Sequence, residues 1–317
     1  MTSEDAQQEL SNNFSLTDFH VIREIGEGAF SKVFMAKWLN NKPDDAPDFV
    51  AIKEISKTKS DGSNLSAKVS NEVEILSSIS NEFLIKYFGS FELIRTFNIL
   101  LEYLPSTVFN VLKKKIYLGE SSVRFFSFQI LLGLEYLHSK EIAYRDLKPE
   151  NTMISSSWMI KLTDFSFSKR IPGRSYTCQG TLEYMAPEIL LNQGHGLAVD
   201  WWAFGVLLYE LCAGHSPFLT KFQLNLVKKI ISGKFQFPPH FSDELRDLVK
   251  RLLVVDPTKR LGCLLEREKT LKTHPWFVDE IDWELSQNNS PKIPKELYDI
   301  NMYETDPTDS SNIEVLI

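Results

Sequence analysis

Residues 144–151 read YRDLKPEN, and residues 162–166 read LTDFS. Both stretches are short polar segments that follow strand-like apolar runs. Asp146 and Asp164 supply carboxylates, and Asn151 supplies an amide. Oxygen ligands of this kind suit magnesium ions and phosphate groups better than they suit a transition metal. We therefore expect the chemistry of the chain to lie in these two loops.

A glycine-rich stretch lies upstream, where residues 26–33 read GEGAFSKV between two strand-like runs. Glycines let a turn bring backbone N–H groups close to phosphate oxygens, because no Cβ stands in the way. Taken alone, the stretch is equally well interpreted as a simple hairpin turn.

A lysine and a glutamate follow the glycine-rich stretch. Lys53 ends the run VAIK, and Glu72 lies about twenty residues later on a predicted helix. A lysine that is aimed at a phosphate inside a cleft needs a carboxylate partner to stay charged. Taken singly, each residue is better interpreted as a surface charge.

The pattern of apolar residues divides the chain into a strand-rich front third and a larger helical portion, with a cleft between them as the natural ligand site. Strands are predicted at residues 19–26, 31–39, 49–55, 85–92 and 96–104, with a Pro- and Asp-rich loop at 40–48. Helices are predicted at residues 66–80, 122–139, 200–214, 224–233 and 243–253.

The charge of the chain is concentrated at its two ends. The formal net charge is −7, and residues 1–18 and 301–317 each carry four acids and no Lys or Arg. The segment between them is close to neutral, which argues against a nucleic-acid binder that relies on bulk positive charge.

Other features of the sequence argue against a membrane-spanning, secreted or myristoylated protein. The apolar run at residues 201–209 is far shorter than the roughly 20 residues that span a bilayer. The acidic start has no apolar core, so no signal peptide is expected, and Thr2 argues against N-myristoylation. The three cysteines lie far apart without metal or disulfide spacing, which favours a cytoplasmic or nuclear location.

Together these segments resemble a eukaryotic protein kinase: a glycine loop, VAIK, a helix glutamate, YRDLKPEN, DFS in place of DFG, and APE at residues 186–188. The match covers roughly residues 19–280. The resemblance implies an α+β, bilobal protein-kinase fold. A small antiparallel β-sheet lobe with one main helix would take residues 19–103, and a larger, mainly helical lobe residues 104–277. Residues 1–18 would form an N-terminal extension and residues 278–317 an AGC-like tail.

Several segments narrow the resemblance to the AGC group and, within it, to cAMP-dependent protein kinase catalytic subunits. These are DFSFSKRIPGRSYT, GTLEYMAPEIL and AVDWWAFGVLLYEL. The lysine of DLKPEN, Lys148, indicates Ser/Thr substrates. The resemblance also makes Glu188 and Arg260 a buried ion pair, and Trp201 and Trp202 core residues.

The resemblance implies ATP and Mg²⁺ as cofactors and assigns site residues. Asp146 would orient the substrate hydroxyl and accept its proton, while Lys148 and Thr181 would stabilise charge and order the loop. Asn151 and Asp164 would hold magnesium. The implied ATP-binding residues are Ile25, Gly26, Glu27, Gly28, Ala29, Phe30, Ser31, Val33, Ala51, Lys53, Glu72, Leu101, Glu102, Leu104 and Asp164.

Regulation and substrate choice are implied in the same way. Thr177 aligns with an activation-loop phosphothreonine, whose phosphate Arg145, Lys169 and Lys68 would receive; the alternative is an exposed loop hydroxyl. Glu150 and Glu210 match acids that bind arginine two or three residues before the target site. Their alternatives are a capping carboxylate and a solvated helix charge.

Three departures from the family pattern stand out. An ungapped count from Glu102 puts Val108 where the family has a third acid, which also touches ribose. Ser166 replaces the DFG glycine, and serine resists conformations that glycine permits. Tyr176 stands where the family has a tryptophan that contacts a cAMP-binding regulatory subunit.

Two rival functions remain open at this point. One is a catalytically weak pseudokinase, an ATP-binding regulatory module. The other is a related kinase that answers to lipids or to an upstream kinase. The expected partners are basic Ser/Thr-containing protein substrates and a cAMP-binding regulatory subunit, with no nucleic acid and no membrane span.

Overall fold

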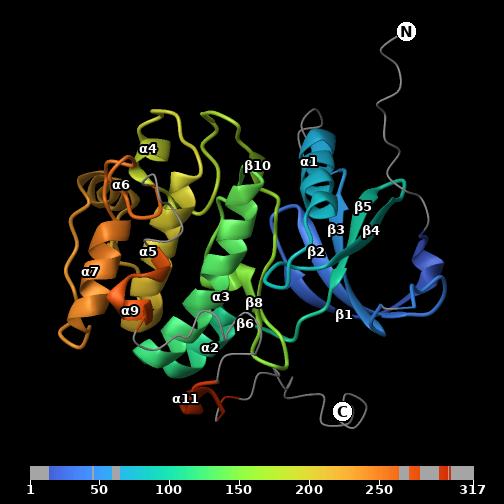
Figure 1. The fold of residues 1–317 in the computed structure, drawn as a ribbon. Helices are drawn as coiled ribbons and strands as arrows, with labels where there is room; N and C mark the ends of the chain where they lie inside the picture. The colour runs from blue at the N-terminus through green and yellow to red at the C-terminus, as the bar shows by residue number, and fades with distance from the viewer. Residues whose placement is uncertain are drawn as a thin grey trace. The chain divides into compact units, whose positions relative to one another are not determined.

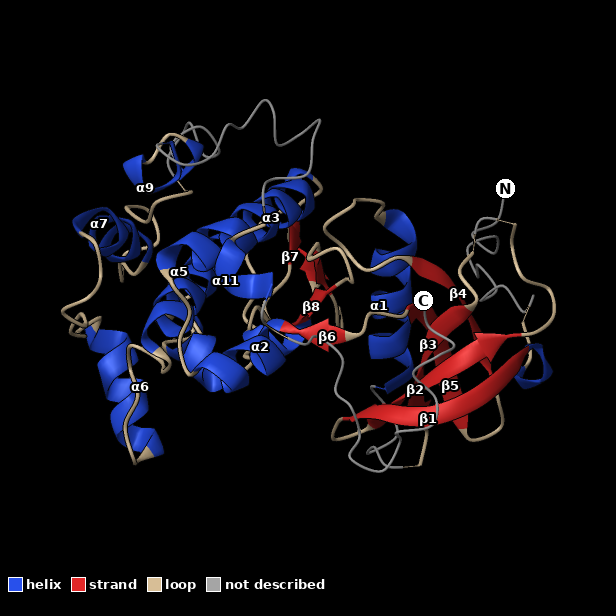
Figure 2. Cartoon of the chain, turned by 90° about the horizontal axis from the view of Figure 1, so that it is seen from below, coloured by secondary structure: helices blue, strands red, loops and turns tan. Residues whose placement is uncertain are grey.

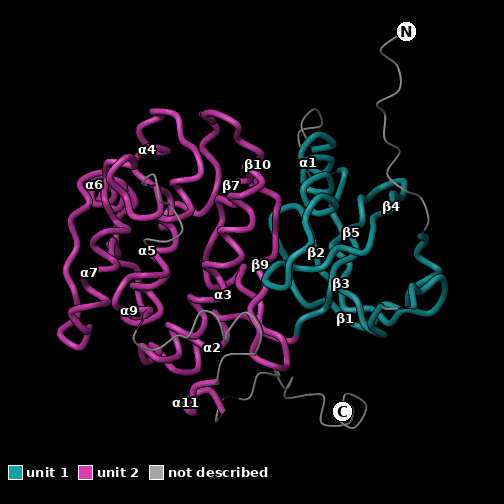
Figure 3. Tube along the Cα trace, in the orientation of Figure 1, with its two compact units in different colours: residues 1–104 teal, residues 105–317 magenta. Residues whose placement is uncertain are grey.

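The chain divides between Leu104 and Pro105 into two units, residues 1–104 and residues 105–317 (Figure 3). The computed structural model describes residues 14–44, 46–58, 65–263, 271–278, 293–298 and 300. Most of the N-terminal extension and of the expected tail therefore lies outside the described residues.

The first unit is built on one antiparallel sheet with the strand order β1-β2-β3-β5-β4 (Figure 1). The strands are β1 (Phe19–Glu27), β2 (Ser31–Trp38), β3 (Phe49–Ser56), β4 (Tyr87–Glu92) and β5 (Thr96–Glu102). A short 3-10 helix, η1 (Leu16–Asp18), precedes β1. All five predicted strands are confirmed. The middle strands β3 and β5 are buried at consecutive residues, so both of their faces are covered, whereas β1 is largely exposed.

Alternation along the strands gives this sheet two different faces. One face packs a cluster that contains Trp38, Ile52 and Leu100 together with Phe19 and Phe91. The residues between them, which include Val33, Ala51 and Lys53, point to the opposite face because successive side chains alternate.

Among the described residues of this unit, the one α-helix is α1 (Leu65–Ser78), which contacts β4. Its buried residues include Val69, Val73 and Leu76, the apolar positions at helical spacing, so the predicted amphipathic helix is confirmed. Glu72 is buried on the same helix.

The described part of the second unit holds most of the helices, a two-stranded sheet and a three-stranded sheet with the order β6-β8-β9 (Figure 2). The helices are α2 (Val108–Lys115), α3 (Glu120–Ser139), α4 (Pro187–Leu190), α5 (Ala198–Ala213), α6 (Gln223–Ser232), α7 (Asp243–Leu252), α9 (Pro275–Val278) and α11 (Lys295–Tyr298). The strands are β6 (Ser106–Thr107), β7 (Ile142–Ala143), β8 (Thr152–Ile154), β9 (Ile160–Leu162) and β10 (Lys169–Arg170). Two 3-10 turns, η2 (Pro149–Asn151) and η3 (Leu182–Tyr184), lie near the loops of interest.

Helix α5 forms the core of this unit and contacts both α3 and α7. It is buried on nearly every side, which explains why its sequence is apolar without a polar stripe. Trp201 and Trp202 are core residues, as predicted. The predicted helices at α3, α5, α6 and α7 are confirmed. Helix α2 was not predicted, although its buried residues Val108, Val111 and Leu112 have helical spacing, because eight residues give only a short pattern.

Among the described residues, no helix is both long enough and apolar enough to cross a membrane.

Candidate active site

Asp200, in the first turn of α5, holds the start of the YRDLKPEN loop through hydrogen bonds to its backbone. The Asp200 carboxylate accepts hydrogen bonds from the backbone N–H groups of Tyr144 and Arg145, both at 2.8 Å. It also contacts His138 Nε2 at 2.8 Å, and it is fully buried. Sequence reasoning did not single out Asp200. A buried carboxylate in the first turn of a core helix was the available signal, because such a group needs partners.

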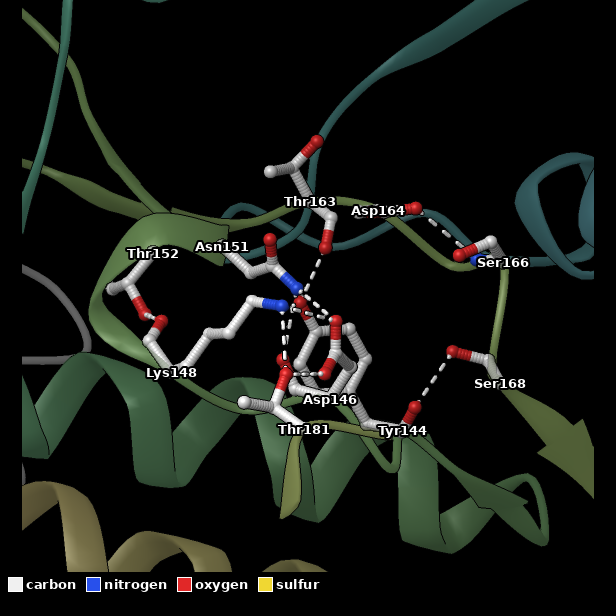
Figure 4. A network of polar contacts seen from close by, with 10 residues as sticks. All are labelled: Tyr144, Asp146, Lys148, Asn151, Thr152, Thr163, Asp164, Ser166, Ser168 and Thr181. Carbon is white, nitrogen blue, oxygen red and sulfur yellow. Dashed lines mark hydrogen bonds and ion pairs between the residues drawn. The ribbon is translucent and has the colours of Figure 1, made fainter. Parts of the chain in front are cut away.

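Asp146 lies at the centre of a network of side-chain contacts in the second unit (Figure 4). Lys148 Nζ donates to its Oδ2 at 2.9 Å, and Thr181 Oγ1 donates to its Oδ1 at 2.9 Å. Asn151 Nδ2 donates to Oδ2 at 2.6 Å and to the Asp146 carbonyl at 2.9 Å. Lys148 Nζ also donates to Thr181 Oγ1 at 2.9 Å. All four residues that were predicted to be catalytic therefore meet at one carboxylate.

Thr181 can contact Asp146 because the residue before it is a glycine, Gly180. Gly180 has φ +119°, and a Cβ there would lie 2.7 Å from the Arg145 carbonyl oxygen. Only glycine allows the two backbones to approach this closely. A side chain at position 180 would therefore move Thr181 away from Asp146.

Asn151 and Asp164 lie at the same end of the β8–β9 hairpin. Thr152 pairs with Leu162 in the hairpin, and the Thr163 N–H donates to the Asn151 carbonyl at 3.0 Å. Asp164 has a left-handed backbone with φ +56°, and its Oδ1 accepts from the Ser166 N–H at 3.4 Å. An amide and a carboxylate fit Mg²⁺, which is usually held by one or two carboxylates together with substrate phosphates.

Tyr144 connects the two loops. Its hydroxyl donates to the Thr163 carbonyl, and its ring packs against Phe165 with ring centroids 5.3 Å apart. Ser168 Oγ donates to the Tyr144 carbonyl at 3.1 Å. The YRD and DFS segments are therefore joined by hydrogen bonds and by packing.

In the first unit, Lys53 and Glu72 form a buried ion pair. Lys53 Nζ lies 2.6 Å from Glu72 Oε1, and the two residues are 8% and 2% exposed. The surface-charge interpretation of these residues is therefore wrong. Lys53 lies opposite Val33 in β2, so these two side chains share a face of the sheet.

The glycine-rich stretch forms the turn between β1 and β2. The Gly28 N–H donates to the Ser31 carbonyl at 2.8 Å, and a Cβ on Gly28 would lie 2.9 Å from Ser31 Oγ. Ile25, Gly26 and Glu27 end β1, Ala29 and Phe30 lie in the turn, and Ser31 and Val33 begin β2. Phe30 is half exposed.

The remaining residues predicted to bind ATP lie on β3, on β5 and just after β5. Ala51 lies opposite Leu101, so both belong to the face that carries Lys53. Glu102 ends β5, and Leu104 is the last residue of the first unit. Ala51, Leu101 and Leu104 are buried.

Thr177 lies beside Arg145. Arg145 Nη1 donates to Thr177 Oγ1 at 2.7 Å, and Arg145 Nε donates to the Phe167 carbonyl at 2.7 Å. Lys169 Nζ donates to Ser175 Oγ at 3.4 Å, and Ser175 Oγ lies 3.0 Å from Thr177 Oγ1. Burial lowers the pKa of Arg145, yet a guanidinium stays charged in proteins. Arg145 therefore contacts Thr177 directly, and Lys169 contacts its neighbour Ser175. Lys68 lies on α1 of the first unit.

Glu150 and Glu210 belong to a group of acids. The Tyr184 hydroxyl donates to Glu210, and burial raises the pKa of Glu210. The negative charges of Glu150 and Glu183 raise the pKa of Glu210 further, which indicates that the three carboxylates lie near one another. Burial and Glu210 raise the pKa of Tyr184, so its hydroxyl remains a donor. Glu183 was not predicted, because no spacing in the sequence links it to the other two.

Val108 is the residue at which the count from Glu102 expects the family's third acid. Val108 is fully buried in α2 and so presents no side chain to a ligand. Thr107 precedes it as the N-cap, and Thr107 Oγ1 accepts from the Asn110 N–H at 3.1 Å. Neither residue is acidic, so a third acid is missing at either position.

Comparison with known proteins decides the family. The model of the protein kinase domain matches residues 19–277. The chain belongs to the protein kinase family. No finding favours the pseudokinase alternative, and the enzyme is an ATP-dependent serine/threonine protein kinase.

The relatives of this kinase include several catalytic subunits. It is 38% identical to "cAMP-dependent protein kinase catalytic subunit PRKX" of Homo sapiens, over 89% of this chain and 77% of the human protein. It is 38% identical to "cAMP-dependent protein kinase catalytic subunit" of Dictyostelium discoideum, over 94% of this chain and 47% of that protein. It is 35% identical to "cAMP-dependent protein kinase type 3" of Saccharomyces cerevisiae, over 87% of this chain and 68% of that protein.

Proposed function

We propose that this kinase transfers the γ-phosphoryl group of ATP to Ser or Thr hydroxyls in basic segments of proteins, with Asp146 as the group that receives the hydroxyl proton. The observation that carries the proposal is the network at Asp146, where Lys148, Thr181 and Asn151 hold one buried carboxylate in a fixed orientation. Phosphoryl transfer depends mainly on positioning and on stabilisation of charge, which such a network supplies.

Lys148 has a second role in this proposal. Its ammonium bridges Asp146 and Thr181, so a cation is already in place beside the residue that binds the substrate hydroxyl. A fixed charge that requires no reorganisation stabilises negative charge as it develops. Thr181 hydrogen-bonds to both Lys148 and Asp146 and so holds the two side chains next to each other.

The residues proposed to bind ATP and magnesium come from the loops at 144–151 and 162–166 and from the sheet of the first unit. Asn151 and Asp164 are the proposed magnesium ligands, and the ion would neutralise phosphate charge when bound. Lys53, which Glu72 holds in place, is the proposed contact to the phosphates. The turn at residues 28–31 is the proposed cover for the phosphates, because a glycine-rich backbone can approach phosphate oxygens closely.

Substitution of Asp146 tests this function. We expect Asp146→Ala to lower kcat by 100-fold or more in a magnesium-ATP assay with a basic Ser peptide, since a positioned base contributes about 10² to 10⁴ in rate. Asp243→Asn on α7 is the matched control, because Asp243 lies on the exposed surface far along the chain, and it should keep full activity. An Asp146→Ala protein with unchanged kcat would refute the proposed role.

Thr177 is the proposed phosphorylation site. Its exposed hydroxyl already contacts Arg145, and a phosphate would add about −1.5 to −2 charges beside that guanidinium. We expect Thr177→Ala to lose the activation that phosphorylation gives, measured as kcat of protein whose modification is followed by mass spectrometry. Equal kcat in the modified wild type and the variant would contradict a switch at Thr177.

A cAMP-binding regulatory subunit is the proposed partner. The support is the naming of the relatives as cAMP-dependent catalytic subunits and the exposure of Tyr176, which is 63% exposed. A pull-down with a regulatory subunit should retain this kinase without cAMP and release it with cAMP. Binding that ignores cAMP would argue against this partner.

A further inference from the structure

A histidine lies buried beneath the segment that carries Thr177. His195, between α4 and α5, is 3% exposed. Its backbone forms an antiparallel bridge with Ser175, with two hydrogen bonds of 2.8 Å. Ser175 is two residues before Thr177, so the bridge holds His195 against the segment that would be modified.

Arg145 lies between this histidine and Thr177. Arg145 Nη1 is 2.7 Å from Thr177 Oγ1 and 3.5 Å from His195 Nε2. A neutral imidazole that carries its proton on Nδ1 leaves Nε2 free to accept from the guanidinium. A protonated imidazole has no acceptor there and would direct an N–H at a cation.

The charges around His195 come from four residues. Arg145 and Lys169 disfavour its protonation, while Glu188 and Asp200 favour it. Burial is the largest effect, and together these lower the pKa of His195 below its ordinary value. Before modification of Thr177 the imidazole is therefore neutral at physiological pH, as a hydrogen bond from Arg145 requires.

We propose that His195 is a positioning residue of the phosphate site at Thr177: the neutral imidazole orients Arg145 toward the hydroxyl before modification, and the imidazole takes up a proton once the phosphate is in place. The proposal rests on the proposed role of Thr177. It adds to that role a residue outside the basic set of Arg145, Lys169 and Lys68, and it couples the modification to pH.

The size of the coupling follows from distance. Thr177 Oγ1 lies no more than about 6 Å from His195 Nε2, because Arg145 Nη1 contacts both. A phosphate on this oxygen therefore lies within roughly 8 Å of the ring, where each negative charge raises a pKa by about one to two units at an effective dielectric constant near 20. The phosphate would thus stabilise the charge of a protonated imidazole through space and offset the repulsion from Arg145.

The direct test is a titration of the histidines in the full chain. The chain has six histidines, and a His195→Gln variant identifies the resonance of His195 in ¹³C-histidine-labelled protein. In the unphosphorylated protein we expect His195 to titrate below 6.5, and in protein phosphorylated on Thr177 at least one unit higher. An unchanged pKa on phosphorylation would overturn the proposal.

Two variants separate positioning from packing. A glutamine side chain can accept a hydrogen bond from Arg145 near the position of Nε2, but it does not titrate. A phenylalanine fills the same space, but it can neither accept a hydrogen bond nor titrate. We expect His195→Gln to keep, and His195→Phe to lose, most of the activation that phosphorylation gives at pH 8. His20→Gln, on the exposed part of β1, is the matched control. Equal activation in the Gln and Phe variants would leave only a packing role and would overturn the positioning role.

The pH dependence provides a second readout. Because the phosphorylated form binds the proton more tightly, linkage makes the stabilisation by phosphorylation larger below the higher pKa and smaller as pH rises through it. The phosphate itself titrates near pH 6, so the quantity to compare is the rise in Tm on phosphorylation in wild type minus that in His195→Gln. This difference should grow from pH 8 to pH 6, and a flat difference would contradict proton uptake at His195.

Failure of the coupling is distinguishable from failure of the proposed function. If mass spectrometry finds no phosphate on Thr177 after treatment with ATP or with an activation-loop kinase, the phosphate site and the coupling fall together. Phosphorylation of the substrate peptide in the same samples would still support the kinase activity and the role of Asp146.

Discussion

Ser166 stands where a glycine is usual, and the structure explains why the serine is tolerated. The left-handed conformation in this loop belongs to Asp164, with φ +56°, whereas Ser166 is not among the described residues with positive φ. A Cβ at position 166 therefore meets no backbone strain in this conformation. The departure therefore does not disturb the backbone that carries Asp164, the proposed metal ligand.

Glu210 supplies a prediction about pH and substrate choice. Burial raises the pKa of Glu210, and the charges of Glu150 and Glu183 raise it further, while the hydrogen bond from Tyr184 opposes these effects. Only the ionised carboxylate attracts a substrate arginine. The preference for arginine over alanine two residues before the target site should therefore fall as the pH drops toward this raised pKa, measured as the ratio of kcat/KM for two peptides.

A variant checks that Glu210 is the group responsible. Glu210→Gln should lower kcat/KM for the arginine peptide about 10- to 100-fold, as expected for loss of a charged hydrogen-bond partner, and should flatten the pH dependence of the ratio. Glu244→Gln, an exposed acid on α7, is the matched control. A ratio that keeps its pH dependence in Glu210→Gln would assign substrate choice to another group.

Among the helices, α5 depends on one glycine for its contact with α7. A Cβ on Gly205 would lie 2.8 Å from Leu252 Cβ and 3.0 Å from Leu253 Cδ2. This close approach lets α5 pack against the end of α7, with Leu252 and Leu253 both buried. A glycine inside an apolar helix is otherwise unfavourable, because it forfeits helix propensity.

Gly205→Ala should therefore destabilise the protein although alanine is the better helix former. Overpacking costs about 1–3 kcal/mol, and alanine returns about 1 kcal/mol of propensity, so a net loss of about 1–2 kcal/mol is expected. The free energy of unfolding in urea measures it. Gly173→Ala is the control, because a Cβ there meets nothing within 4 Å. A more stable Gly205→Ala protein would show that α5 and α7 can separate without loss.

Across the second unit, the ion pair between Glu188 and Arg260 joins segments 72 residues apart, and the predicted buried pair is confirmed. Arg260 Nη1 and Nη2 lie 2.8 and 2.9 Å from the two oxygens of Glu188, and the arginine is fully buried. The guanidinium also lies over the ring of Trp202 at 5.2 Å. The pair thus fixes the APE segment to the core around α5.

Removal of both partners should cost less than the two separate removals added together. Arg260→Ala leaves a buried carboxylate without its partner, and we expect a loss of about 3–5 kcal/mol in the free energy of unfolding. The double variant with Glu188→Ala should lose less than the sum of the two single variants, because no uncompensated charge remains. Additive losses in this double-mutant cycle would argue against a coupled pair.

The sequence by itself determined the kinds of element and most of the chemistry. Alternating apolar runs specify β1 to β5, and helical periodicity specifies α1, α3, α6 and α7, because burial of one face is a local pattern. The loops at 144–151 and 162–166 carry the candidate site residues at fixed local spacing, so Asp146, Asn151 and Asp164 could be proposed without coordinates.

Tertiary structure alone decided which distant groups meet. The contacts of Asp200 with the loop at Tyr144, of Thr181 with Asp146, and of His195 with Arg145 join residues that lie 35 to 56 positions apart. The burial of Val108 in α2 was also decided by the fold, because counting residues does not show which side chains the core covers. A sequence records which side chains are available, but hydrogen bonds and burial depend on distances that exist only after the chain has folded.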